Sequence, residues 1–388
     1  MEQPRSRVQI IATTNPKEIC TKQEFDTFGG MAAGVCYMND TFDALRTEDH
    51  AKTARRVKMT KESGHHSVYD HCYISMFLQD IPRVIECMLD NERMMVSSVK
   101  SGRYTRHALS SEEGVLYDKW VDIFKGLIRD KYADSSPKFF TEGRIEKLAM
   151  ENARYLTSSF TRISMIHTIS YRQLNYVYGF MRDFVAKKST NHFINKTKRY
   201  VEEFLKQLDA TGFIDEGLID SGKNRMLSLF KNGEVSEYFG NVYATSYKGS
   251  FAYFCHANRH RTLKYHVAEP PSTDKLEFYT PEILHGNKKL CSQWNKDLDS
   301  LREYYPQAFM LNITEMGNID DFILKLYERK CSVVMLETMR YTNDLLNKYV
   351  KVHPELKDYV KGSRCTFKKF NCTSTCGFPE GIAEKRKI

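Results

Sequence analysis

The chain has 388 residues, of which 41% are hydrophobic and 28% charged, a composition that excludes an intrinsically disordered protein. Its formal net charge of +9 indicates an anionic partner, either a nucleic acid or a small phosphorylated molecule. No stretch approaches the roughly 18 uninterrupted apolar residues of a membrane span and the first residues hold no signal-peptide core, so we expect a cytoplasmic protein without membrane contact.

The first half alternates between strand and helix patterns. A short apolar run at 8–12 is followed by "DHCYISMFLQ" at 70–79, where every second residue is apolar, as in a half-buried strand. From Ile81 the apolar period becomes helical, with Pro82 in the first turn, where its missing N–H does no harm. The spacing predicts further helices over 115–132, 144–156 and 195–211.

Glycine and acidic residues near 211 indicate a boundary, after which the order of parts repeats. An aromatic strand is expected over 242–254, then a basic motif, a loop, and helices over 293–305, 318–330 and 333–350. We therefore predict an α+β fold of two diverged tandem copies, arising by duplication, although two unrelated units could share this coarse order by chance. The predicted divisions are 1–210, 211–360 and a basic cysteine-containing tail over 361–388.

The segment "GHHSVYDH" at 64–71 gathers His65, His66, Asp70 and His71. Such a cluster could ligate the metal of a phosphohydrolase, and on a helix His66 and Asp70 would share a face. Because the segment runs into a strand, however, His65 and His66 would point to opposite faces. Two other interpretations stay open: structural capping or core hydrogen bonding, and binding of a cofactor or anion.

The segment "SVKSGRYTRH" at 98–107 contains Ser101, Gly102 and Arg103. A hydroxyl, approachable backbone amides and a planar guanidinium suit a phosphate group. The alternative is an ordinary helix end with basic residues near its C-terminus.

The segment "CHANRHRTLKYHV" at 255–267 places Arg259, His260 and Arg261 in succession. Two permanent guanidiniums can grip phosphates, while the imidazole offers a titratable donor or a stacking surface. A solvated basic patch is the alternative. The chain holds no Rossmann, P-loop or nucleophile-elbow signature.

Ten cysteines without regular spacing indicate reduced thiols. Near the C-terminus Cys365, Cys372 and Cys376 could bind zinc if a residue such as His353 supplied a fourth ligand. Three cysteines do not close a tetrahedron, so we expect no metal.

Taken together, these motifs resemble the flavin-dependent thymidylate synthases of the ThyX type. "GHHSVYDH" matches the early histidine element of that family, and "SGRY" at 101–104 matches its nucleotide-binding end. The Arg-His-Arg triplet of the family belongs between these elements, where Asn91, Glu92 and Arg93 stand. The second half retains the triplet at 259–261 but lacks the other two elements, so each half keeps what the other has lost.

The resemblance implies a ThyX-like fold, a twisted antiparallel sheet packed against long helices in each copy, and FAD as the cofactor. It implies that NADPH and methylenetetrahydrofolate are co-substrates and that a one-carbon unit passes to C5 of dUMP. Arg259 and Arg103 would act in catalysis. The residues implied to bind the nucleotide are Ser101, Gly102, Arg103, Arg154, Arg182 and Arg329, and those implied to bind the flavin are His65, Ser67, Arg259, His260 and Arg261.

The family works as a homotetramer in which the triplet of one chain meets the Ser-Gly-Arg of another. The resemblance therefore implies a composite site built from both halves of this chain, and a homodimer that restores four units. Three alternatives to thymidylate synthesis stay open: another C5 modification such as hydroxymethylation, an inactive ThyX-like protein that binds nucleic acid, and the metal-dependent phosphohydrolase.

Overall fold

The computed structural model describes residues 6–14, 19–37, 41–102, 107–134, 138–219, 226–231, 235–368, 370–372, 376 and 385–388. The chain divides into two compact units: unit 1 comprises 1–100 and 162–228, and unit 2 comprises 101–161 and 229–388. Among the described residues, no helix is long and apolar enough to cross a membrane.

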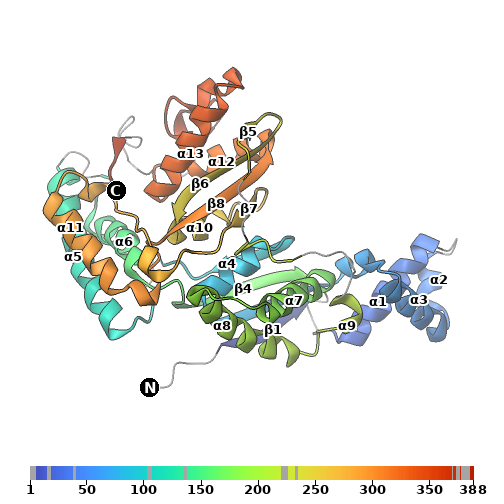
Figure 1. Cartoon of the computed structure of the whole chain (residues 1–388). Helices are drawn as coiled ribbons and strands as arrows, with labels where there is room; N and C mark the ends of the chain where they lie inside the picture. The colour runs from blue at the N-terminus through green and yellow to red at the C-terminus, as the bar shows by residue number, and fades with distance from the viewer. Residues whose placement is uncertain are drawn as a thin grey trace. The chain divides into compact units, whose positions relative to one another are not determined.

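Unit 1 is built on a four-stranded antiparallel sheet with the order β1-β2-β4-β3. Two long helices run side by side along this sheet, α7 and α8 (Figure 1). The strands are β1 (Arg7–Thr13), β2 (Tyr73–Pro82), β3 (Met95–Val99) and β4 (Arg162–Ser170). The helices are α1 (Lys22–Tyr37), α2 (Phe42–Thr47), α3 (His50–Glu62), the 3₁₀ turn η1 (His66–His71), α4 (Arg83–Asn91), α7 (Tyr171–Ala186), α8 (His192–Asp209) and α9 (Glu216–Ile219).

The strand-to-helix transition predicted at Ile81 is confirmed. Ile74, Met76 and Leu78 of β2 are fully buried on one face, and α4 follows directly, with Pro82 as its N-cap. The helix predicted over 195–211 is confirmed as α8, whose apolar stripe faces the interior.

Unit 2 contains a second four-stranded antiparallel sheet, with the order β5-β6-β8-β7. Its strands are β5 (Tyr238–Phe239), β6 (Val242–Ser250), β7 (Lys264–Val267) and β8 (Met310–Asn318). Its α-helices are α5 (Ser111–Tyr132), α6 (Glu142–Ala153), α10 (Phe251–Ala257), α11 (Lys288–Ser300), α12 (Ile319–Arg329) and α13 (Leu336–Tyr349). Short 3₁₀ turns are η2 (Arg154–Leu156), η3 (Thr273–Lys275), η4 (Glu282–Leu284), η5 (Arg302–Tyr304), η6 (Pro354–Tyr359) and η7 (Arg364–Thr366).

The two sheets have the same strand order, and in each of them both central strands lead directly into a helix. In unit 1 these pairs are β2 with α4 and β4 with α7; in unit 2 they are β6 with α10 and β8 with α12. This correspondence is compatible with the predicted duplication, which stays a prediction.

Unit 1 is discontinuous in sequence, which differs from the predicted division at 211. After β3 the chain enters unit 2, forms α5 and α6, and returns at β4. The apolar face of α5 explains this path, because Trp120 packs edge-on against Trp294 of α11 at 4.8 Å between ring centroids. Both tryptophans are fully buried. The apolar face of α5 is therefore buried by residues of unit 2.

The aromatic strand predicted over 242–254 is wrong beyond Ser250. The Ser250 hydroxyl accepts a hydrogen bond from the backbone N–H of Tyr253 and so caps α10. The residues "FAYF" at 251–254 are all buried, so a helix surrounded by core produces the same apolar run as a buried strand.

Candidate functional site

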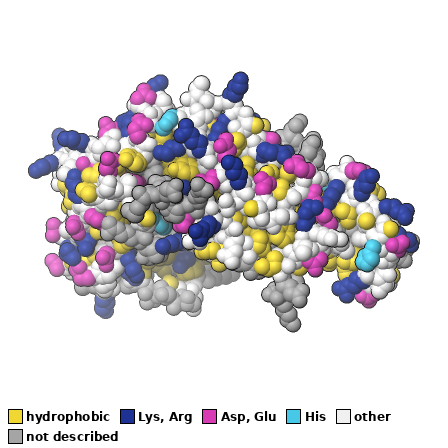
Figure 2. All heavy atoms as spheres, turned by 90° about the horizontal axis from the view of Figure 1, so that it is seen from below, with side chains coloured by type: hydrophobic (Ala, Val, Ile, Leu, Met, Phe, Trp, Pro, Cys, Tyr) yellow, Lys and Arg dark blue, Asp and Glu magenta, His cyan; other side chains and the backbone are white. Residues whose placement is uncertain are grey.

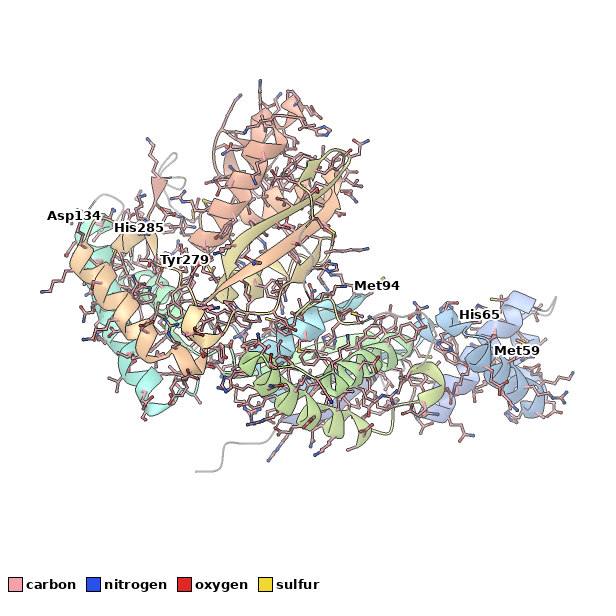
Figure 3. The ribbon with its side chains drawn as sticks, viewed as in Figure 1. Met59, His65, Met94, Asp134, Tyr279 and His285 are labelled. Atoms are coloured by element: carbon pink, nitrogen blue, oxygen red, sulfur yellow. The ribbon has the colours of Figure 1, made fainter. Side chains whose placement is uncertain are left out.

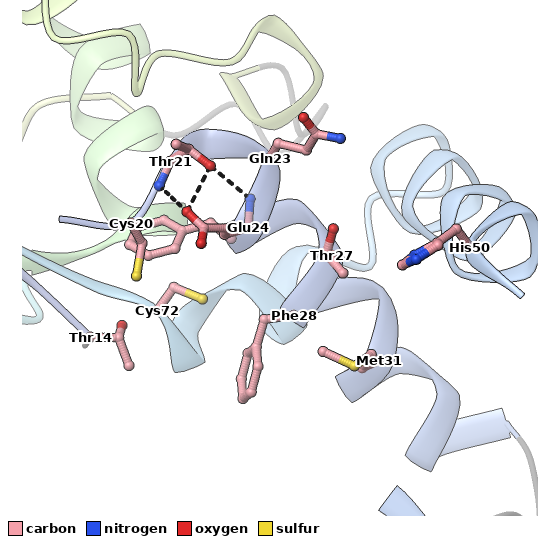
Figure 4. A pocket seen from close by; sticks show the side chains of 11 residues that line it. Thr14, Cys20, Thr21, Gln23, Glu24, Thr27, Phe28, Met31, His50 and Cys72 are labelled. Atoms are coloured by element: carbon pink, nitrogen blue, oxygen red, sulfur yellow. Dashed lines mark hydrogen bonds between the residues drawn. The ribbon is translucent and has the colours of Figure 1, made fainter. Parts of the chain in front are cut away.

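Unit 1 contains a cavity of about 550 Å³ at the start of α1 (Figure 4). The wall is formed by Thr14, Cys20, Thr21, Gln23, Glu24, Phe25, Thr27, Phe28, Met31, His50 and Cys72. Thr21 and Glu24 form a reciprocal capping interaction at this end of α1: the Thr21 N–H and hydroxyl donate to Glu24 Oε2 at 2.6 and 2.8 Å. The wall contains no Lys or Arg, so the cavity suits an uncharged ring better than a phosphate.

The predicted histidine motif ends at this cavity. His71 packs edge-on against Phe28 with 6.4 Å between ring centroids, and Cys72 forms part of the wall. Burial raises the pKa of the Cys72 thiol to about 12, and the neighbouring Cys20 acts in the same direction. The residue after the motif, Cys72, therefore lines the cavity, and His71 packs against the wall residue Phe28.

The other motif residues do not assemble a metal site. His66 is buried, with Nδ1 3.1 Å from the Tyr176 hydroxyl and Nε2 3.0 Å from the Lys61 carbonyl. Asp70 accepts a hydrogen bond from Ser170 at 2.6 Å and forms an ion pair with Arg172 at 2.5 Å. Within the described part of the chain, these ligand atoms do not gather within reach of one ion. The hydrogen bonds of the buried His66 agree with the core hydrogen-bonding interpretation of this residue.

The flavin-binding residues expected in this motif lie close together in sequence but differ in exposure. His65 is half-buried between α3 and η1 (Figure 3), and Ser67 is exposed on η1.

A second group of predicted residues surrounds α10 in unit 2. Arg154 donates from Nη2 to the Ala252 carbonyl at 3.1 Å and contacts Met335 Sδ at 2.8 Å. Arg329 lies one turn further along, with Nη2 3.4 Å from the His256 carbonyl and Nη1 3.3 Å from His256 Nε2. Two arginines that are 175 positions apart in the sequence therefore meet the same helix.

The guanidinium groups of Arg154 and Arg329 do not use all of their hydrogen-bond donors. Within the residues that the structure describes, the buried Nε atoms of Arg154 and Arg329 have no hydrogen-bond partner. Arg329 is only 12% exposed, and its Nη2 lies 3.9 Å from the Glu328 carboxylate. Burial lowers the pKa of Arg329, and the charge of Arg259 acts in the same direction. This part of unit 2 is therefore electropositive and retains free donors.

The Arg-His-Arg triplet lies in the turn between α10 and β7, neither on a strand nor on a helix. The His260 side chain is 2% exposed, with Nδ1 2.7 Å from Glu328 Oε2 and Nε2 3.1 Å from the Thr262 hydroxyl. His260 thus fixes the turn, while Arg259 is half-buried and Arg261 exposed. Glu328 connects the triplet to the last turn of α12, which carries Arg329.

Other predicted residues lie apart from this group. Arg182 is an exposed residue of unit 1 that forms an ion pair with Glu216 at 2.9 Å. Ser101 and Gly102 are half-buried and begin the part of the sequence that belongs to unit 2. Arg103 lies outside the described residues.

The sequence reasoning missed the start of α13 as part of this region. Glu337 is buried there and accepts hydrogen bonds from the Tyr155 hydroxyl at 2.7 Å and from the Ser250 N–H at 2.9 Å. Burial raises the pKa of Glu337. No local signal could have identified Glu337, because its partners come from segments far away in the sequence.

Residues 21–207 match the family model described as thymidylate synthase complementing protein. Among solved structures, the UMP/dUMP methylase PolB from Streptomyces cacaoi bound with 5-Br dUMP is 14% identical, with a TM-score of 0.34, over 53% of this chain and 89% of that one. The flavin-dependent thymidylate synthase ThyX from Helicobacter pylori complexed with FAD and dUMP is 14% identical, with a TM-score of 0.32, over 55% of this chain and 100% of that one. Both structural likenesses are too weak to assign a function, and no curated protein matches the chain. The family match covers the histidine motif and the Ser-Gly-Arg-Tyr element, so residues 21–207 of this chain are similar to the thymidylate synthase complementing protein family.

Proposed function

We propose that the protein is a FAD-dependent enzyme that transfers a one-carbon unit from methylenetetrahydrofolate to C5 of dUMP. The observation that carries this proposal is the family match over residues 21–207, which contains two of the three motifs expected for such an enzyme. NADPH would be the source of reducing equivalents.

The nucleotide phosphate fits the arginines around α10. Arg154 and Arg329 each keep a buried Nε without a partner among the described residues, and a phosphate accepts several charge-assisted hydrogen bonds. Ser101, Gly102 and Arg103 would complete the nucleotide site. Arg182 was expected to join them, but its guanidinium already forms an exposed ion pair with Glu216. We therefore leave Arg182 out of the proposed nucleotide site.

Two residues of the Arg-His-Arg triplet would bind FAD, and the third would have a structural role instead of the expected contact with the flavin. Arg259 and Arg261 are accessible enough to bind its phosphates, with Arg259 also near the pyrimidine, whereas the buried ring of His260 would hold the turn in shape. His65 and Ser67 would contribute from the other half of the sequence. When bound, FAD supplies the redox chemistry, and the protein supplies orientation and charge.

We further propose that the active protein is a homodimer whose sites use motifs from both halves of the sequence. The complementary loss of motifs supports this arrangement, because neither half alone carries a complete set.

Absorbance spectroscopy and a turnover assay test the proposal. Purified protein should show flavin bands, or acquire them when FAD is added, and should convert dUMP to dTMP with NADPH and methylenetetrahydrofolate. Mass spectrometry of the nucleotide product separates methylation from the alternative, hydroxymethylation. Protein that never binds FAD would contradict the proposal.

A nucleic-acid-binding protein is the alternative from another class. In the view of Figure 2, Lys and Arg side chains are interspersed with Asp and Glu and form no single basic face. A nucleic-acid interface is usually an extended basic surface, so this view favours a small anionic ligand as the reason for the positive charge.

A further inference from the structure

The middle residue of the Arg-His-Arg triplet is anchored along α12. His260 Nδ1 lies 2.7 Å from Glu328 Oε2 in the last turn of this helix. The other ring nitrogen, Nε2, lies 3.3 Å from the Asp321 carbonyl in the first turn and 3.1 Å from the Thr262 hydroxyl. Because the imidazole has polar contacts at both nitrogens, it cannot rotate without breaking one of them. The contacts with α12 therefore fix the ring and, with it, the turn.

Glu328 is suited to hold the imidazole because its carboxylate is ionised. Its pKa lies below the ordinary value of a glutamate, chiefly because of the hydrogen bond with His260, and the charges of Arg329 and Arg261 act in the same direction. An ionised carboxylate only accepts hydrogen bonds, so His260 Nδ1 carries a proton and donates it to Glu328. Such a charge-assisted bond is stronger than one between two neutral groups.

Two adjacent residues of α12 hold the same short segment of chain. Arg329 Nη2 lies 3.4 Å from the His256 carbonyl in the last turn of α10, and Glu328 accepts from His260 four residues later. The end of α12 thus contacts both the helix before the triplet and the triplet itself. A change at Glu328 is therefore expected to alter the turn while the contact of Arg329 with α10 remains.

The anchored residue differs in exposure from its two neighbours. The His260 side chain is 2% exposed, whereas Arg259 is half-buried and Arg261 is exposed. Because both arginines are bonded directly to His260, the backbone that the imidazole fixes also defines where their side chains begin. A ligand that binds them therefore has to immobilise less of the chain than it would on a mobile loop.

We propose that Glu328 is the positioning residue of the triplet: by holding His260, it keeps Arg259 and Arg261 in the arrangement that binds the two phosphates of FAD. A guanidinium donates two parallel hydrogen bonds to a phosphate only when its position is defined. The inference rests on the proposed function, in which the triplet binds FAD. It adds a residue that acts through His260 and does not touch the cofactor.

Hydrogen exchange of the full-length protein, resolved at single amides, tests the effect on the turn without any ligand. The reporters are two amides that close the turn: the His260 N–H donates to the Ala257 carbonyl at 2.9 Å, and the Leu263 N–H donates to the His260 carbonyl at 3.3 Å. In Glu328→Ala we expect both to exchange at least about tenfold faster than in the wild type. Glu328→Gln keeps an acceptor oxygen and should stay within about threefold of the wild type.

Titration of FAD, followed by its fluorescence, tests the effect on the cofactor. The Kd should rise at least about tenfold in Glu328→Ala and stay within about threefold of the wild type in Glu328→Gln. The matched control is Glu355→Ala, which removes a glutamate from a similar contact in the same unit, with His353 Nδ1 2.8 Å from Glu355 Oε1. This control should change neither the Kd nor the exchange of the two amides.

The outcomes separate this inference from the proposed function. Wild-type protein that never binds FAD would contradict both. If the wild type binds FAD and Glu328→Ala binds it equally well, the positioning role alone is wrong. Unchanged exchange of the two amides in Glu328→Ala, or a Glu328→Gln variant as impaired as Glu328→Ala, would also overturn it, because the hydrogen bond would then not be what holds the turn.

Discussion

Arg329 and His256 form a donor-acceptor pair in which the guanidinium fixes the state of the imidazole. Arg329 Nη1 lies 3.3 Å from His256 Nε2, and the other ring nitrogen lies 3.0 Å from the Thr338 hydroxyl. Because a guanidinium only donates, Nε2 must accept, and the ring is neutral with its proton on Nδ1. The pair holds Arg329 in place without neutralising its charge.

Replacement of Arg329 should therefore weaken nucleotide binding. We expect Arg329→Gln to raise the Kd for dUMP at least tenfold, since a hydrogen bond to a charged group contributes about 1.5–3 kcal/mol. Isothermal titration calorimetry measures this change. The matched control is Arg129→Gln, which removes an arginine from an exposed ion pair with Glu142 in the same unit and should leave the Kd unchanged. Equal affinities for the two variants would remove Arg329 from the nucleotide site.

A second prediction concerns the buried ion pair that links β8 to α12. The side chains of Glu315 and Lys325 are 0% and 1% exposed, and Lys325 Nζ lies 2.7 and 2.8 Å from the two carboxylate oxygens. Tyr243 and Tyr247 each donate to the same carboxylate at 2.6 Å. Lys325→Met should reduce the free energy of unfolding of unit 2 by about 3–5 kcal/mol, because it leaves a buried carboxylate without its counter-charge.

Urea unfolding followed by tryptophan fluorescence measures this loss, since Trp120 and Trp294 are the two tryptophans of the chain and both lie in unit 2. Lys248→Met is the control, because its pair with Glu277 is largely exposed, and it should change the free energy by less than about 1 kcal/mol. Equal losses in the two variants would show that burial of the pair is not what makes Lys325 important.

Cys72 should be far less reactive than Cys36, an exposed thiol of the same unit. With a pKa of about 12, the thiolate fraction of Cys72 at pH 8 is on the order of 1 in 10,000. Iodoacetamide should alkylate the exposed Cys36 first and leave Cys72 unmodified until unfolding. Peptide mass spectrometry over a time course measures both rates. Comparable rates in the native protein would contradict the burial of Cys72.

Local patterns were sufficient to predict only part of the secondary structure, including β2, α4 and α8. The alternation around Ile74 and the helical period after Pro82 have one explanation each, because one face of each element is buried. The sequence pattern wrongly predicted a strand at "FAYF". These residues lie in a helix that is buried on all sides, so no polar face marks the helical period. The pattern also failed to place α5, since the partner of Trp120 is Trp294, far away in the sequence.

For the candidate nucleotide site around α10, the sequence could indicate the types of residue involved but not their arrangement in space. The family resemblance implied roles for Arg154 and Arg329, but their shared contact with α10 depends on the tertiary fold. His260 shows the opposite case: a basic triplet suggests three ligand-binding residues, yet its middle ring is directed into hydrogen bonds that stabilise the turn. Sequence spacing does not distinguish a side chain that is available to a ligand from one that stabilises a turn.

The last prediction concerns the stability of unit 1 in acid. Asp215 accepts hydrogen bonds from Lys61 at 2.8 Å and from the Tyr171 hydroxyl at 3.2 Å, and Lys22 Nζ lies 2.6 Å away. Burial raises the pKa of Asp215, but the hydrogen bonds and charges of Lys22 and Lys61 outweigh it and hold the pKa at about 2. The ordinary value in an unfolded chain is about 3.9.

Because the folded pKa lies below the unfolded one, the contribution of Asp215 is complete above about pH 5 and is lost as the pH falls through the folded value toward about pH 1. Its size is about 2.6 kcal/mol. Wild type and Asp215→Asn should therefore differ by this amount at pH 6 and converge near about pH 1, as measured by hydrogen exchange of the α1 amides after correction for intrinsic rates. Asp43→Asn is the control, since Asp43 is 92% exposed and should show no such difference. A gap between wild type and Asp215→Asn that persists undiminished to about pH 1 would mean that the carboxylate contributes through packing, because a contribution from charge must vanish once the group is protonated in both states.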